Sequence, residues 1–263
     1  MNPLKLIPVA LITLCLFAAC SKDGTATNTT TTTTTTTTGT ITYADASGLP
    51  APYNKIYGAQ QIYVEGTNLV VKTQDIPEHK SPYYAGTTWA STKYEAYNGT
   101  GSFIANPSSI AAQSITFKIP MSPAVAGTHA ATPMGPIGFA INGVPLFNQY
   151  AAGGSPLGGE IISFDQYGGH PQQSNMYHYH VEPTWITSQK GKDALIGFLL
   201  DGFPVYGPKE NGVILTSANL DAYHGHFGVT ADYPAGIYHY HVSADAPYLN
   251  GSGFYGTAGT VTQ

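Results

Sequence analysis

The residues with the clearest chemical potential are histidines that recur in pairs two positions apart. The sequence Tyr-His-Tyr-His occurs at residues 177–180 and again at residues 238–241. On a β-strand, residues two apart share a face, so His178 and His180 point one way and the tyrosines the other. Their Cα atoms would stand roughly 6.5–7 Å apart, a separation from which both imidazoles can converge on one ion. Each motif therefore predicts a chelating face of imidazoles and an opposite face of packed tyrosines.

The two motifs close a longer internal duplication. Residues 138–147 match residues 197–206, and the segment that ends at His170 matches the one that ends at His226, in the same order as the Tyr-His-Tyr-His blocks. The sequence thus encodes two copies of one unit, at about residues 137–183 and 196–244. The second copy carries extra residues, around 229–235, before its final strand.

Three histidines occupy matching positions in each copy, and we take them as candidate metal ligands: His170, His178 and His180, then His226, His239 and His241. The first of each three lies in a Gly-containing segment that we interpret as a loop able to complete a three-His site with an open position. His224 joins the candidates although the first copy has Gly168 at that position. His79 and His129 lie outside the repeat, and we interpret them as structural.

The number of sites and the role of the imidazoles stay open at this point. Each copy could hold its own ion, or the copies could pack about a pseudo-two-fold axis around one shared site, which aligned strands favour slightly. The alternative to metal binding is a Tyr-His hydrogen-bond network that stiffens the core or forms a pH-sensitive interface. Burying so many imidazoles without a shared partner is costly, so we favour metal binding.

Acidic residues sit at the turns of both copies. The first block of each copy ends in Asn-Gly or Asp-Gly, which favours a tight hairpin whose two central residues have positive φ. The hairpin turn alone can explain why an aspartate stands at position 201. Asp201, Asp165 and Asp221 are also candidates for residues that hydrogen-bond to the metal ligands, or for the carboxylate base that a hydrolase needs.

Local patterns elsewhere predict strands. Residues 59–64 and 69–72 flank a turn at 66–68, and residues 114–120 alternate polar and apolar side chains. Gly or Pro interrupts the chain nearly every ten residues thereafter, so the best helix candidate, residues 185–194, is short. We predict a mainly β fold, a sandwich or barrel-like domain built on a duplicated hairpin-loop-strand unit.

The N-terminal residues predict export and lipidation. Residues 1–19 read as a signal peptide, with Lys5 before an apolar run too short for a permanent span. Small residues then precede Cys20, as in a bacterial lipobox, so Cys20 is the expected lipidation site. Residues 20–40 form a Thr-rich stalk expected to be disordered, and residues 41–263 a single β-rich domain. We expect a lipid-anchored protein of the cell envelope, on the outer membrane, periplasmic or surface-exposed.

Composition limits the partners and the ion. Cys15 leaves with the signal and Cys20 carries the lipid, so the mature domain offers no thiol to a metal. All-nitrogen sites suit copper or zinc, and an oxidising compartment favours copper. The net charge of -5 without a basic stripe excludes nucleic-acid binding, so the expected partners are a metal ion and, through the anchor, a membrane.

Three features resemble the bacterial YHYH-domain family: the repeated Tyr-His-Tyr-His, the Asp-Gly-Phe-Pro run at residues 201–204 and the Gly-His-Pro at residues 169–171. The resemblance covers about residues 114–244 and implies a secreted or surface protein with a metal site and no assigned activity. Three functions follow as hypotheses. They are a metal-handling surface protein, a metal-dependent enzyme (copper oxidoreductase or zinc hydrolase), and an adhesion or glycan-binding module whose histidines are structural.

Overall fold

The structure is a computed structural model that describes residues 41–263, so the predicted signal peptide, Cys20 and the Thr-rich stalk lie outside the described residues. Sixteen strands form a four-stranded sheet, an eight-stranded sheet and two two-stranded ribbons. The mainly β prediction is confirmed. Over residues 41–263 no sheet closes into a barrel, which leaves the sandwich-like alternative.

The four-stranded sheet has the order β1-β2-β3-β16. Its strands are β1 (Gln61–Glu65), β2 (Asn68–Thr73), β3 (Ile115–Pro120) and β16 (Thr260–Thr262). The first two form the predicted hairpin around Gly66, whose φ of 61° suits glycine. β3 alternates buried and half-buried residues, as its sequence predicts.

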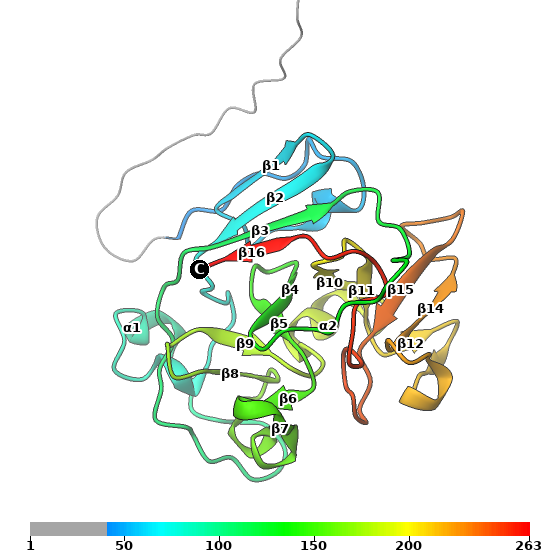
Figure 1. Ribbon diagram of the computed structural model, residues 1–263. Helices are drawn as coiled ribbons and strands as arrows, with labels where there is room; N and C mark the ends of the chain where they lie inside the picture. The colour runs from blue at the N-terminus through cyan, green and yellow to red at the C-terminus, as the bar shows by residue number, and fades with distance from the viewer. Residues whose placement is uncertain (1–40) are drawn as a thin grey trace, which may run out of the picture. The chain divides into compact units, whose positions relative to one another are not determined.

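The eight-stranded sheet reads β14-β15-β11-β10-β4-β5-β9-β8, so equivalent strands of the two copies follow one another outward from β4 and β10, and Figure 1 shows β8 and β14 on opposite sides of them. The first copy supplies β4 (Pro136–Ala140), β5 (Pro145–Phe147), β8 (Gly169–Pro171) and β9 (Tyr177–Tyr179). The second supplies β10 (Leu195–Leu199), β11 (Pro204–Tyr206), β14 (Gly225–Gly228) and β15 (Ile237–His241). Each copy thus places its hairpin at the centre of the sheet and its histidine strands at an outer end, which confirms the predicted duplication.

The copies meet where β4 pairs antiparallel with β10. Phe139 lies opposite Phe198, and these two residues are equivalent in the repeat. The flanking pairs are Gly138 with Leu199 and Gly197 with Ala140, so the register is symmetric about the phenylalanines. A Cβ on Gly197 would collide with the Phe139 carbonyl oxygen, which explains why this strand crossing uses glycine.

The hairpins are present, but their turn type differs from the prediction. In the first copy the Ala140 N–H donates to the Val144 carbonyl at 2.8 Å, which closes a three-residue loop rather than a two-residue turn. Gly143 has a φ of 82°, whereas Asn142 is not among the residues with positive φ. The Asn142 side chain instead accepts the Val144 N–H at 3.3 Å. A type I turn followed by a left-handed glycine satisfies the Asn-Gly signal equally well.

The remaining elements are short. They are the ribbons β6 (Tyr150–Ala151) with β7 (Ser155–Pro156) and β12 (Lys209–Glu210) with β13 (Val213–Ile214), helices α1 (Ala90–Lys93) and α2 (Thr184–Lys190), and 3-10 turns η1 (Tyr53–Lys55), η2 (Pro82–Tyr84), η3 (Ala152–Gly154), η4 (Leu157–Gly159), η5 (Ile161–Ser163) and η6 (Ser217–Asn219). The predicted helix at 185–194 ends early because Gly191 adopts a φ of 107°. From residue 41 onward, no helix has the length and apolarity to cross a membrane.

One hydrophobic core includes residues of both large sheets. Phe117 of β3 packs on Phe139 of β4, with ring centroids 5.0 Å apart, and Phe139 lies 6.0 Å from Phe198. All three side chains are fully buried. The strands that carry the histidines are therefore attached to a rigid apolar centre.

We predict that Gly197→Ala destabilises the protein by about 1–3 kcal/mol, because the added methyl group overpacks the crossing of β4 and β10. Gly158→Ala is the matched control, since its Cβ would meet no atom within 4 Å. The control should change stability by less than about 0.5 kcal/mol. Urea unfolding of both variants measures the effect, and equal stabilities would contradict the crossing geometry.

Candidate metal centres

The first cluster consists of His170, His178 and His180. His170 on β8 lies directly opposite His178 on the antiparallel strand β9, and His180 follows β9 on the face of His178. The Nε2 atom of His178 lies 3.2 Å from that of His170 and 2.9 Å from that of His180. His170 therefore comes from a paired strand, not from the loop that we expected, because residues 169–171 hydrogen-bond to β9.

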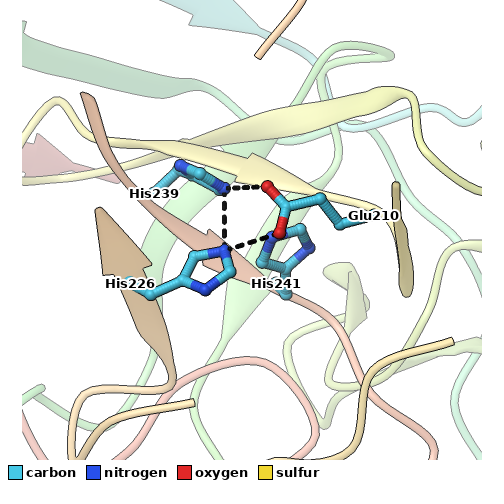
Figure 2. Close-up of side chains that lie close together, drawn as sticks. All are labelled: Glu210, His226, His239 and His241. Atoms are coloured by element: carbon cyan, nitrogen blue, oxygen red, sulfur yellow. Dashed lines mark hydrogen bonds and ion pairs between the residues drawn. The ribbon is translucent and has the colours of Figure 1, made fainter. Parts of the chain in front are cut away.

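The second cluster consists of Glu210, His226, His239 and His241 (Figure 2). His226 on β14 faces His239 on β15, with 3.2 Å between their Nε2 atoms. Glu210 on β12 reaches both rings, at 3.1 Å from His226 Nε2 and 3.3 Å from His239 Nε2. In each cluster the potential ligand atoms all lie within 4.8 Å of one another.

The clusters are separate, so the slight preference for one shared site is wrong. The pseudo-two-fold axis passes through the Phe139–Phe198 pair at the centre of the eight-stranded sheet, and the symmetry places β8 and β14 at its two edges. Alignment of the two copies therefore moves the histidine strands apart instead of bringing four histidines together.

His224 was a candidate ligand, and it lies outside both clusters. Its backbone has a φ of 70°, close to the 84° of its counterpart Gly168, so the turn before each histidine strand needs a left-handed residue. The His224 side chain is buried, and its Nε2 atom hydrogen-bonds to Ser243 Oγ at 2.9 Å. Its role in the structure is that of a turn residue with a satisfied side chain.

Backbone carbonyls set the tautomer of the motif histidines. His178 Nδ1 lies 3.2 Å from the Met176 carbonyl oxygen and His180 Nδ1 lies 2.6 Å from that of Asn148. The equivalent contacts in the second copy are His239 Nδ1 to Ile237 O at 3.0 Å and His241 Nδ1 to Gly207 O at 2.7 Å. A carbonyl only accepts, so Nδ1 carries the hydrogen and Nε2 of the neutral ring presents a lone pair.

Burial keeps the first cluster uncharged. It lowers the pKa of His170 to about 3, with a smaller contribution from His180, and that of His180 to about 4. Burial also moves the pKa of His178 well below its ordinary value. At neutral pH the 2.9 Å contact between His178 and His180 therefore sets two lone pairs against each other. Tetrahedral ligation at about 2.0–2.1 Å separates donor atoms by about 3.3 Å, so a shared cation fits this spacing.

The second cluster also brings hydrogen-bond acceptors together. Burial lowers the pKa of His239, so its Nε2 atom meets the Glu210 carboxylate as one acceptor against another. His241 Nε2 is buried and has no hydrogen-bond partner in the described part of the chain. Burial lowers the pKa of His241 to about 3, so the ring stays neutral at pH 7 and its Nε2 atom stays an acceptor without a donor. Three imidazoles and a carboxylate suit a divalent transition metal.

Sequence reasoning missed Glu210. The repeat aligns it with Ala151, so the signal was a carboxylate present in one copy only, four residues after the block that ends at Tyr206. The histidines outside the repeat, His79 and His129, lie outside both clusters. His79 Nε2 lies 3.0 Å from the Tyr179 hydroxyl, and His129 stacks on Tyr223.

A comparison with protein families gives one match. The model described as "YHYH protein" matches residues 116–213 and 209–253, which together span just over half of the chain. The chain belongs to the YHYH family. Neither the search of curated proteins nor that of solved structures gives a match.

The tyrosines of the YHYH motifs hold the histidine strands in place. The first tyrosine of each motif donates to the aspartate of the preceding turn, Tyr177 to Asp165 and Tyr238 to Asp221, both at 2.9 Å. In the second position, Tyr240 donates to Asp201 at 2.6 Å.

The equivalent tyrosine of the first copy is Tyr179, which accepts from the Asn142 amide at 3.1 Å. The three candidate aspartates therefore bind tyrosines, on the face away from the imidazoles. The structure does not place them behind the metal ligands or at the position of a base, and the carboxylate beside the histidines is Glu210.

We predict that Asp201 makes the free energy of unfolding depend on pH. Burial raises its pKa from 3.8 to about 6, so the folded state binds this proton more tightly than the unfolded chain does. The stabilisation that protonated Asp201 contributes is therefore complete below about pH 4 and is lost as the pH rises through about 6. Asp201→Asn removes the titration, so the wild type should lose roughly 2–3 kcal/mol relative to the variant across that interval. Urea unfolding of both proteins from about pH 4 to 7 tests this, and a pH-independent difference would contradict it.

Proposed function

We propose that this protein is an extracytoplasmic lipoprotein that binds two transition-metal ions, one in each histidine cluster, and that it handles or sequesters the metal. The observation that carries the proposal is the convergence of unprotonated Nε2 atoms at the same place in both copies. Four backbone carbonyls set this tautomer, and burial keeps the rings neutral. Proteins bury such arrangements of acceptors when a cation completes them.

We propose copper or zinc as the ion. The donor sets are three imidazoles in the first cluster, and three imidazoles with one carboxylate in the second. Nitrogen-rich sets without thiolate suit Cu(II) and Zn(II), and export to an oxidising compartment favours copper. A bound divalent ion would neutralise the converging lone pairs and supply Lewis-acid or, for copper, redox chemistry.

A metal-dependent enzyme is the second candidate function, and Glu210 is the observation that favours it. Its carboxylate lies within 3.3 Å of two histidine Nε2 atoms and its side chain is 20% exposed. A carboxylate beside a metal site can bind the ion or accept a proton from a substrate or water. The sequence patterns identify no substrate, so metal handling is the primary proposal.

We predict that metal content follows the clusters. The protein should bind two copper or zinc ions, His178→Ala and His239→Ala should each retain one, and the double variant should retain none. His129→Ala is the control and should keep two, because His129 lies outside both clusters. Elemental analysis after dialysis measures the content.

Wild-type protein that stays metal-free under copper and zinc titration would contradict metal binding and support histidines with a purely structural role, as the adhesion or glycan-binding hypothesis requires. Two ions retained by the double variant would show that the ligands lie elsewhere.

The anchor is tested separately. If Cys20 carries the lipid, Cys20→Ala should move the protein from the membrane fraction to the soluble fraction of the cell envelope. Fractionation of cells that express each form, followed by immunoblotting, measures this. An unchanged distribution would overturn the lipoprotein proposal without affecting the metal sites.

A further inference from the structure

The two clusters share one arrangement of histidines but have different surroundings. The first is enclosed by aromatic rings. Phe147 stacks on His178 at a centroid distance of 3.9 Å, and Phe164 lies edge-on to His170 at 4.7 Å and parallel to His180 at 5.8 Å. All three histidines are 2% exposed. An ion there would be surrounded by apolar rings and cut off from solvent.

In the second copy the enclosing residues differ. The repeat places Tyr206 where the first copy has Phe147, and Leu220 where it has Phe164. Glu210 replaces Ala151 in the same way. The side chain of His226 is 30% exposed and that of Glu210 is 20% exposed, so the second cluster is open on the side of β12 and β14.

A cavity of about 150 Å³ leads to this open side. Glu210, His239 and His241 form one wall of it, and Val229, Thr230 and Ala231 form another. The second wall belongs to the extra segment that the second copy carries between β14 and β15. The insertion therefore shapes a space beside the metal ligands that has no counterpart segment in the first copy.

The inserted segment is held in position. The Tyr206 hydroxyl lies 2.9 Å from Thr230 Oγ1 and donates to the Asp232 carboxylate at 3.0 Å, which also forms an ion pair with Lys55. Tyr206 itself lines the cavity. The hydroxyl that distinguishes Tyr206 from its counterpart Phe147 thus anchors the wall of the cavity.

The cavity lining mixes polar and apolar side chains and includes a cation. Lys209 lines the cavity and makes no ion pair within residues 41–263, whereas Lys55 pairs with Asp232 and Lys192 with Glu182. The remaining charged residue of the lining is Asp193. A divalent ion held by Glu210 and three imidazoles would keep a net positive charge, and Lys209 would offset Asp193, so the cavity would attract small anions.

We propose that the ion of the second cluster is accessible from this cavity and binds a small anion there as an additional ligand, while the first cluster encloses its ion away from solvent. The inference rests on the proposed metal binding and assigns a different role to the site in each copy. The difference between the two sites lies in solvent access and not in the number of protein donors, which is three in the first cluster and four in the second. Lys209 favours the anion by charge.

Azide is the probe, because it binds Cu(II) and changes its visible absorption and electron paramagnetic resonance spectrum. The protein is loaded with two equivalents of copper and titrated with sodium azide. The proposal predicts that half of the bound copper responds. His178→Ala should keep the whole azide response with one copper, and His239→Ala should lose it. Lys209→Ala should weaken azide binding about threefold to fivefold, whereas the exposed Lys190→Ala control should leave it unchanged.

A second measurement needs no variant. Copper removal by excess EDTA should be biphasic in the wild-type protein, with a fast half from the open site and a slow half from the enclosed one. Two bound coppers that respond equally to azide, or that both ignore it, would overturn the inference and leave the metal-binding proposal intact. Failure to bind copper or zinc at all would overturn both.

Discussion

The two clusters depend on which ring nitrogen of each motif histidine carries the hydrogen. In both copies a backbone carbonyl receives Nδ1–H, so Nε2 is left as an unprotonated donor atom that points at its neighbours. Burial then prevents the rings from relieving the contact by protonation. The tyrosines, the turn aspartates and the strand pairing all serve to hold the rings in this orientation. A cation is the simplest partner for such a group of acceptors.

Duplication explains how one arrangement can hold two different sites. The strands of both copies rest on the same symmetric crossing at Phe139 and Phe198, so each cluster inherits its geometry from a shared core. Changes outside that core are then tolerated, because loops accept insertions and substitutions more easily than packed strands. The segment after β14 is an insertion of this kind, whereas Tyr206 and Glu210 are substitutions on the short strands β11 and β12. They alter the access and charge of one cluster and leave the histidine geometry in place.

Much of the site follows from local patterns, and the failures have physical causes. The two-residue period of a strand placed His178 with His180 and His239 with His241, and the repeat identified His170 and His226. Strand order is a long-range property that spacing does not encode, so the separation of the clusters was not predictable. His224 was misleading because the left-handed turn that it occupies is invisible without its φ angle. Glu210 lies on β12, far in sequence from the second Tyr-His-Tyr-His motif. The only sequence signal for it was that the first copy has Ala151 at the equivalent position.

The most direct test of the account is a crystal structure of the copper- or zinc-loaded protein with anomalous diffraction at the metal edge. We expect two anomalous peaks, one among the Nε2 atoms of His170, His178 and His180, and one beside Glu210, His226, His239 and His241. Ligand distances should be about 2.0–2.2 Å. Peaks absent from both clusters, or bound through Nδ1 instead of Nε2, would contradict the central claim.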